Sequence, residues 1–478
     1  MKILRKYKLY DLVYAISEIS REMFIDFKFM KIYNRNPTMV SVWDMIGLSY
    51  IGICKCSESE KKSLKNNNDV LSILKKYVKY KRKKYLKELN KNKENISNLN
   101  LITYISFGHA QEQLPHQSRY LMIEDSTRNF ELLNILRNNS KNIDVDNIMQ
   151  ETFGMNFEEF IYNFSGLLFI ATLSSDITDI NIDSIIKNNK NISYEKLFKI
   201  REYYSASYED FRKSKLGKQY LKLKPIVKTS DNRYIVINTY LLYEKLIDGA
   251  YWVIRDYYEK RGKQTFVNEF GKIYEIYLEN LFDRYLKEYK YEKLEESMEE
   301  KRCDWKVKTN KYTILIEQKS SLININTKDL YTDIKTIEKY LLEKLSKAFI
   351  QLDSTEKQIS SDKIVIKLAL VYENLYIPEV LECKIKEILN SEDKEIKNEY
   401  NNTFLIETRE IERLMYILST DENLFNKIIE RKLEADEMPQ GEKRSFLTIM
   451  EEFGVAQFNN YLDEKKNPID LVLASYEN

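Results

Sequence analysis

The sequence has little of several residues and patterns that mark particular classes of protein. Glycine and proline number only 11 and 6 among 478 residues, while 43% of the chain is hydrophobic, so a globular protein is expected and not a disordered one. The four cysteines fit the spacing of neither a disulfide framework nor a four-ligand zinc site. No run of about 18 apolar residues occurs, and the N-terminal stretch lacks the apolar region of a signal peptide. We therefore expect a cytoplasmic protein with no membrane partner.

An excess of charge of one sign is also missing. The 76 Lys and Arg residues nearly balance the 74 Asp and Glu residues and leave a net charge of +2. Only local clusters can therefore indicate a nucleic-acid partner. Residues 61–93 form such a cluster, because they hold thirteen Lys and Arg residues against two acidic ones, with tyrosines between them. This pattern suits phosphate neutralisation and base stacking, with Lys79, Arg82 and Lys83 as candidate contacts, but a merely solvated basic helix is an equal alternative in a Lys-rich chain.

The length predicts two or three domains. Residues 1–220 are expected to form a mainly α-helical module for sensing, nucleic-acid binding or dimerisation. Residues 221–262 hold two short β-rich runs around Thr229–Asn232, which indicate a hairpin, and then a connecting helix. Residues 263–420 contain the clearest alternation of helices and strands, and residues 421–478 are expected to be a polar helical tail.

The pattern in 263–420 predicts a mixed α/β sandwich. Apolar residues at helical spacing indicate a long helix over 264–288. Two strands, CDWKVK and YTILIEQK, follow around a short turn at Thr309–Asn310. A helix at about 333–358 precedes the strand 363–372, and FLIET (404–408) predicts a further strand that leads into a helix.

The hairpin over 303–319 gathers charged residues on one face. If the turn is symmetric about Thr309–Asn310, Asp304 lies opposite Leu315 and Glu317 is its diagonal neighbour on the same face, about 7–8 Å away between backbones. Lys319 shares this face because side chains alternate along a strand. The other face is apolar and carries Trp305, Val307, Ile314 and Ile316.

Two carboxylates and an ammonium group on one strand face suit phosphodiester hydrolysis. Mg²⁺ prefers oxygen ligands and takes one or two protein carboxylates, so Asp304 and Glu317 are candidate ligands, with the backbone carbonyl of Gln318 as a third. A bound metal ion lowers the pKa of a water molecule and neutralises charge on the phosphate. Lys319 is placed to orient that water or to hold the phosphate.

These residues resemble a known family. Asp304, twelve intervening residues and then Glu317-Gln318-Lys319 are similar to the signature of the PD-(D/E)xK nuclease superfamily, with Cys303 in place of the proline. The segment FGKIYEIYLENLF (270–282) is similar to the family's first helix, in which a Gly is followed four residues later by a metal-site Glu. That position is Glu275, with Glu279 one turn further as the second candidate. The later helix offers Gln351 and Lys347 as phosphate contacts.

The resemblance implies a restriction-endonuclease-like α/β sandwich with a mixed central sheet over about residues 263–420. It implies a nuclease dependent on Mg²⁺ or Mn²⁺, with DNA favoured over RNA and endonuclease action favoured. By analogy, antiphage defence or restriction is the expected setting, with a homodimer or a partner subunit as a further expectation. The alternative is an inactive protein that keeps the nuclease fold and serves as a nucleic-acid-binding or scaffold subunit.

Overall fold

The computed structural model of the chain describes residues 2–33, 38–58, 63–64, 67–92, 98–116, 119–179, 192–287, 289–294, 302–320, 339, 341–392, 400–457, 459–465 and 467–468. The chain separates into two compact units. The first comprises Met1–Glu94, Gln113–Phe266 and Lys466–Asn478, and the second comprises Asn95–Glu112 and Val267–Lys465. The main division at Phe266 is close to the predicted one at 263. The sequence did not indicate that Asn95–Glu112 or the segment from 421 to 465 would group with the second unit.

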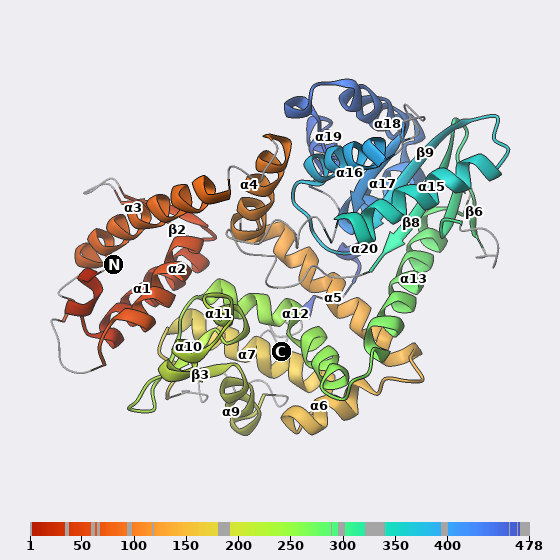
Figure 1. Cartoon of the computed structure of the whole chain (residues 1–478). Helices are drawn as coiled ribbons and strands as arrows, with labels where there is room; N and C mark the ends of the chain where they lie inside the picture. Colours follow the sequence, from red (N-terminus) through yellow and green to blue (C-terminus); the bar gives the residue numbers. More distant parts are fainter. Residues whose placement is uncertain are drawn as a thin grey trace. The chain divides into compact units, whose positions relative to one another are not determined.

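The first unit is mainly helical (Figure 1). Its helices are α1 (Leu9–Ile25), α2 (Val42–Lys55), α3 (Asn67–Asn92), α5 (Arg119–Asn139), α6 (Val145–Phe153), α7 (Phe157–Leu173), α9 (Tyr194–Tyr203), α10 (Tyr208–Lys213), α11 (Gln219–Leu223) and α12 (Thr239–Glu259), with 3-10 turns at Lys2–Lys6 and Leu114–His116. Two small sheets accompany them, one of β1 (Met30–Tyr33) and β2 (Thr38–Ser41), the other of β3 (Ser205–Ser207), β4 (Ile226–Lys228) and β5 (Tyr234–Val236).

Local sequence explains where several of these elements begin and end. Gly154 adopts a positive φ of 69°, which ends α6, and Asn156 then caps α7 by accepting from the backbone N of Glu159 at 2.9 Å. The predicted hairpin around Thr229–Asn232 is confirmed, because β4 and β5 pair antiparallel with Ile226 opposite Val236. The strand β3, which the sequence did not indicate, extends this hairpin by parallel pairing to β4.

The second unit is built on a five-stranded mixed sheet in the order β10-β9-β8-β7-β6. The strands β6 (Lys290–Lys293), β7 (Trp305–Lys308) and β8 (Tyr312–Lys319) form an antiparallel meander. Next to β8, β9 (Ile364–Val371) and β10 (Thr403–Glu407) run parallel to it. The predicted mixed helix-and-sheet architecture of this region is confirmed. The strands β7, β8, β9 and β10 lie at the predicted positions, whereas the sequence did not indicate β6.

Helices cover both faces of this sheet (Figure 1). On one face lies α13 (Thr265–Tyr285), whose Phe282 ring is 5.3 Å from that of Trp305. On the other face α15 (Ser346–Gln358) packs against β8 and β9, and its Thr355 accepts a hydrogen bond from the Cys303 backbone N at 2.8 Å. The remaining helices of the unit are α4 (Asn98–Gln113), α16 (Pro378–Glu392), α17 (Thr408–Thr420), α18 (Glu422–Glu437), α19 (Phe446–Glu452) and α20 (Asn460–Asp463), with a π-helical turn at Leu341–Leu345 and a 3-10 turn at Gln440–Glu442.

The segment after residue 421 is more than a polar tail. Its helices bury Phe425, Phe446 and Tyr461 in the second unit. The side chain of Glu412 on α17 accepts from Tyr277 at 2.5 Å and from Asn459 at 2.7 Å, so this segment is tied to the helices beside the sheet. No described helix is both long enough and apolar enough to span a membrane.

Candidate active site

The hairpin β7–β8 has a register that differs from the predicted one. Trp305 pairs with Ile316, so the register continues to Asp304 directly opposite Glu317 and not opposite Leu315. The predicted turn at Thr309–Asn310 is wrong by one residue, because Thr309 pairs with Tyr312 and leaves Asn310 and Lys311 as the loop. The shift is two positions along the partner strand, so the side-chain alternation is unchanged. Asp304, Glu317 and Lys319 therefore still share one face, as predicted.

Asp304 lies at the bend just before β7, beside the end of β8. One of its carboxylate oxygens accepts a hydrogen bond from the backbone N of Gln318 at 2.7 Å. Within a strand, the N–H and the C=O of one residue point to the same side. The Gln318 carbonyl is therefore directed toward Asp304, where the sequence predicted a third oxygen ligand. The Gln318 side chain lies on the other face and accepts from the Trp305 indole N–H at 3.1 Å.

Glu317 is the most deeply buried acidic group of the site, with 2% of its surface exposed. Burial, and after it the negative charge of the neighbouring Asp304, raise the pKa of its carboxyl to about 8. The Lys319 ammonium opposes both effects. Like charges in close contact cannot both ionise without a compensating cation. The Glu317–Asp304 pair therefore favours either a retained proton or a bound cation.

Lys319 is the cation that the structure places beside this pair. Its ammonium group forms an ion pair with Glu317 and donates to Oε1 of Gln351 on α15 at 3.1 Å. A quarter of the Lys319 side chain remains exposed, compared with 3% for Glu317. Lys319 thus connects the buried carboxylates to the surface. Gln351, predicted from the sequence as a phosphate contact, lies at the site, whereas Lys347 is an exposed residue one turn earlier on α15.

The oxygen atoms present fit a hard divalent cation. The Glu317 Oε2 atom is buried and has no hydrogen-bond partner among the described residues. A buried carboxylate oxygen without a hydrogen-bond partner is unfavourable unless it binds a ligand such as a cation. Asp304, Glu317 and the Gln318 carbonyl supply the number of protein oxygens that Mg²⁺ or Mn²⁺ commonly takes, since the remaining positions are filled by water. Within the described ranges, no group of three His, Cys, Asp or Glu side chains is close enough to hold a metal ion.

Glu275, which the resemblance implies as a further metal-site residue, has another partner in the structure. Its carboxylate forms an ion pair with Lys293 on β6. The hydrogen bond to Glu275 contributes most to raising the pKa of Lys293. The negative charges of Glu275, Glu279 and Asp304 raise it further. Lys293 pairs with Trp305 in the sheet, so it lies on the α13 face. Sequence reasoning missed Lys293, because only the pairing of β6 with β7 brings it near Glu275 and Asp304.

The helix α13 passes close to the end of β8. A Cβ atom added to Gly271 would lie 3.5 Å from the Ser320 hydroxyl, which is ordinary van der Waals contact. Gly271 lies inside the helix and does not begin it, since α13 starts at Thr265. The predicted apolar stripe of this helix is confirmed, with Phe270, Ile273 and Tyr277 all buried.

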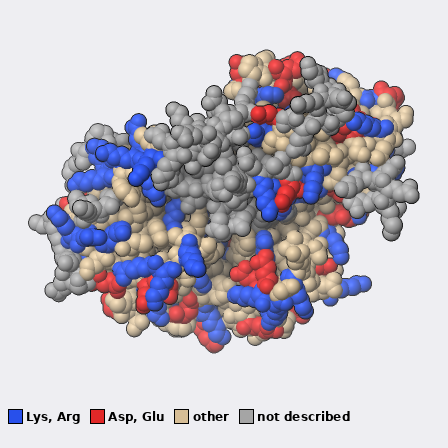
Figure 2. Space-filling model, viewed as in Figure 1, with Lys and Arg blue, Asp and Glu red and all other residues tan. Residues whose placement is uncertain are grey.

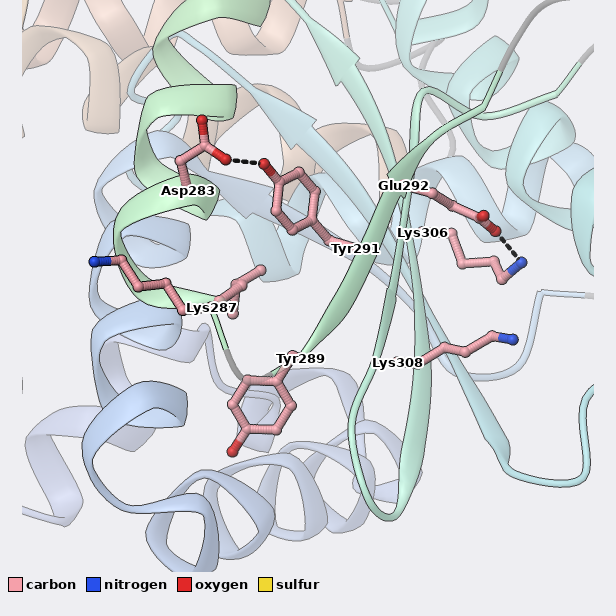
Figure 3. Close-up of a pocket in the computed structure, with 8 residues that line it drawn as sticks. Asp283, Lys287, Tyr289, Tyr291, Glu292, Lys306 and Lys308 are labelled. Carbon is pink, nitrogen blue, oxygen red and sulfur yellow. Dashed lines mark hydrogen bonds and ion pairs between the residues drawn. The ribbon is translucent and has the colours of Figure 1, made fainter.

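A separate pocket of about 340 Å³ lies at the outer edge of the sheet, between the end of α13 and the strands β6 and β7 (Figure 3). Its polar groups are largely satisfied by one another, since Tyr291 donates to Asp283 and Lys306 pairs with Glu292. Figure 3 shows Glu292, Lys306 and Lys308 on one side of the hairpin and Asp283 and Lys287 on the other. The lining residues do not include the Asp304–Glu317 pair.

The candidate nucleic-acid contacts Lys79, Arg82 and Lys83 lie on α3 in the first unit, and all three are exposed. They are thus separate from the acidic pair, which belongs to the second unit.

Comparison with known proteins assigns neither a family nor a relative: no family model, no curated protein and no solved structure matches this chain.

Proposed function

We propose that the protein is a metal-dependent nuclease that hydrolyses phosphodiester bonds, with DNA as the favoured substrate. The observation that carries this proposal is the buried carboxylate pair of Asp304 and Glu317, with the Lys319 ammonium on the same face of the sheet. A purely structural role explains this group poorly, because two adjacent acidic groups in a buried position destabilise the fold unless a cation joins them.

Each residue has a role that follows from its position. Asp304, Glu317 and the Gln318 carbonyl would hold Mg²⁺ or Mn²⁺. When bound, such an ion supplies an activated water molecule and neutralises the charge that develops on the phosphate. Lys319, which is partly exposed and held by Gln351, binds a phosphate oxygen or orients the attacking water. Gln351 keeps the Lys319 ammonium on the open side of the carboxylates.

The arrangement of elements supports the resemblance to the PD-(D/E)xK superfamily and its restriction-endonuclease-like fold. The helix that carries Glu275 comes first, the hairpin that carries Asp304 and Glu317 follows, and the helix that carries Gln351 comes before β9. The central sheet is mixed, as the resemblance implies. The parallel strands β8, β9 and β10 end at the edge of the sheet where Asp304 directly precedes β7, and such edges are common positions for catalytic groups.

The direct test incubates the purified full-length protein with supercoiled plasmid, linear duplex DNA and RNA, each in Mg²⁺, Mn²⁺ or EDTA. We expect conversion of supercoiled plasmid to open-circular and linear forms with either metal ion and no conversion in EDTA. Metal-dependent cleavage of RNA but not of DNA would support the proposed metal-dependent hydrolysis and would show that RNA is the substrate. Cleavage that persists in EDTA, or no cleavage of any substrate, would contradict the proposal and favour an inactive nuclease-fold protein.

A further inference from the structure

The helix α3 (Asn67–Asn92) changes character along its length. In its first half, Val70, Leu71, Ile73, Leu74 and Tyr77 are buried and fix the helix to the first unit. From residue 78 to residue 87 every side chain is exposed except two, Lys81 and Tyr85, which are half-buried. The second half therefore extends along the surface with little apolar contact of its own.

Between Asp69 and Glu88, the two acidic residues of this helix, all the charges are positive. Residues 75–87 contain eight Lys and Arg residues and no acidic residue. Lys81 is turned toward the first unit and pairs with Asp44 on α2 at 3.2 Å. Figure 2 shows basic side chains grouped along this helix, at the left of the view. A balanced chain thus carries a strongly positive local surface.

Six of the eight cations fall on one face. At 100° per residue, Lys75, Lys76, Lys79, Arg82, Lys83 and Lys87 occupy an arc of about 140°, centred opposite the buried residues. All six are exposed. Pairs such as Lys79–Arg82, Lys79–Lys83 and Lys83–Lys87 are three or four residues apart, so their charges repel one another and destabilise the helix. A polyanion bound on this face would remove that repulsion.

The dimensions of this basic face match a phosphate backbone. From Lys75 to Lys87 the helix rises about 18 Å at 1.5 Å per residue. Six cations over this length give about one every 3 Å, close to the rise of roughly 3.4 Å along the duplex axis for each charge of one DNA strand. An α-helix is also of a size that the major groove of a DNA duplex admits.

An anionic membrane fits this surface less well. Helices that lie on membranes need a continuous apolar face beside the basic one. The exposed apolar residues of this segment, Val78, Tyr80 and Leu86, lie in three different directions around the helix and form no stripe. Tyr80 is available for stacking against a base.

We propose that the basic face of α3 is a docking surface for the phosphate backbone of nucleic acid. The proposal does not depend on catalysis, because α3 belongs to the first unit and the carboxylate pair to the second. Backbone contacts of this kind position a protein on nucleic acid without reading its sequence. The surface is therefore expected to bind duplex and single-stranded nucleic acid with little sequence preference.

The test measures binding of fluorescein-labelled duplex DNA and single-stranded DNA to the full-length protein by anisotropy, in EDTA, across a salt series. The variant Lys79→Gln, Arg82→Gln, Lys83→Gln removes three cations from the basic face and keeps good helix formers. The matched control Lys141→Gln, Lys215→Gln, Lys263→Gln removes three exposed cations elsewhere in the first unit. We expect the first variant to lose affinity by at least about tenfold and to lower the salt slope for duplex by up to about 2.7, at roughly 0.9 per phosphate contact.

The control is expected to bind like the wild type. Equal loss in both variants, or no loss in the first, would overturn the proposal. Vesicles that contain phosphatidylserine and a polyglutamate peptide serve as competing anions, and preferential binding of either over DNA would also overturn it. If the triple variant fails to fold, Lys83→Gln alone must lower the duplex slope by about 0.9. Because binding is measured in EDTA, where a metal-dependent nuclease cannot cleave, these results are independent of whether the protein is a nuclease.

Discussion

The substitution Glu317→Gln tests the electrostatic state of the candidate site without any assumption about substrate. Glu317 is 2% exposed, and its pKa is raised from the ordinary value of 4.5 to about 8, first by burial and then by Asp304. Glutamine has nearly the same shape and carries no charge. In metal-free protein it should therefore relieve the repulsion between the two carboxylates.

The sign of the effect follows from proton binding. Because the pKa is higher in the folded protein than in the unfolded chain, the folded state retains a proton that the unfolded state loses between pH 4.5 and about 8. Wild-type stability should therefore fall across that window. A shift of about 3.5 units at 1.36 kcal/mol per unit sets a ceiling of about 5 kcal/mol. The opposing effect of the Lys319 ammonium is already contained in this pKa, but relaxation of the folded protein and water penetration lower the effective cost of burying the charge. We therefore expect a gain of roughly 1–2 kcal/mol for Glu317→Gln at pH 8.5, or about 2–8 °C in Tm for a unit of this size.

The assay is thermal unfolding in EDTA at a series of pH values from 5 to 8.5. The matched control is Glu279→Gln, which neutralises an exposed carboxylate on α13. We expect Glu317→Gln and wild type to have similar Tm values near pH 5 and to diverge as the pH rises, while Glu279→Gln follows wild type throughout. A Glu317→Gln curve that is parallel to wild type, or less stable at pH 8.5, would refute the reasoning.

Four further predictions concern the same unit. Mn²⁺ should raise the Tm of wild type and of Lys319→Ala but not of Asp304→Ala or Glu317→Ala, because only the carboxylates are expected to bind the ion; stabilisation of all four would place the metal elsewhere. Gln351→Leu should lower the cleavage rate by about tenfold or more and leave the Mn²⁺-induced Tm shift unchanged, because it removes the hydrogen bond that holds Lys319 and leaves the carboxylates in place. Loss of the Tm shift would show that Gln351 supports the metal site instead. Lys293→Met should change the stability of the metal-free protein by no more than about 1 kcal/mol, because its ion pair with Glu275 is partly exposed. If Glu275 is a metal ligand, this substitution should also increase the stabilisation by Mn²⁺. An unchanged Mn²⁺ effect would exclude Glu275 from the site. Trp305→Ala should destabilise the second unit by about 3–5 kcal/mol in urea unfolding, because its 1% exposed ring packs against Phe282; a loss below about 1 kcal/mol would contradict the described core.

The hairpin shows what local sequence can and cannot predict. The face shared by Asp304, Glu317 and Lys319 was predictable, because alternation along a strand does not depend on the exact register. The register itself was wrong by two positions. Asn310 in the loop bonds through its backbone N and its side chain to Glu422, at 3.0 and 2.6 Å. This contact spans more than a hundred residues, so no local pattern reveals where the turn falls.

Long-range pairing also explains the other differences. Lys293 meets Glu275 only because β6 pairs with β7, and no local sequence motif indicates this pairing. The segment from 421 to 465 looked polar, yet it belongs to the second unit. Within it, Asn459 donates a hydrogen bond to Glu412, and the Tyr461 ring packs edge-on against Tyr277. By contrast, α13 and β9 were predicted to within a few residues, because each has a long and regular apolar pattern. The first part of the predicted helix at 333–358, namely residues 333–338 and 340, lies outside the described residues.

The central claim is that Asp304 and Glu317 form the catalytic centre. The most direct measurement compares the rates of plasmid cleavage in Mn²⁺ for wild type, Asp304→Ala and Glu317→Ala at equal protein concentration, with circular dichroism to confirm that each variant is folded. We expect metal-dependent cleavage by wild type and a loss of at least about a thousandfold in both variants, since each removes a group that would hold the ion at the reacting phosphate. Cleavage by Glu317→Ala at the wild-type rate would mean that the active site lies elsewhere in the chain.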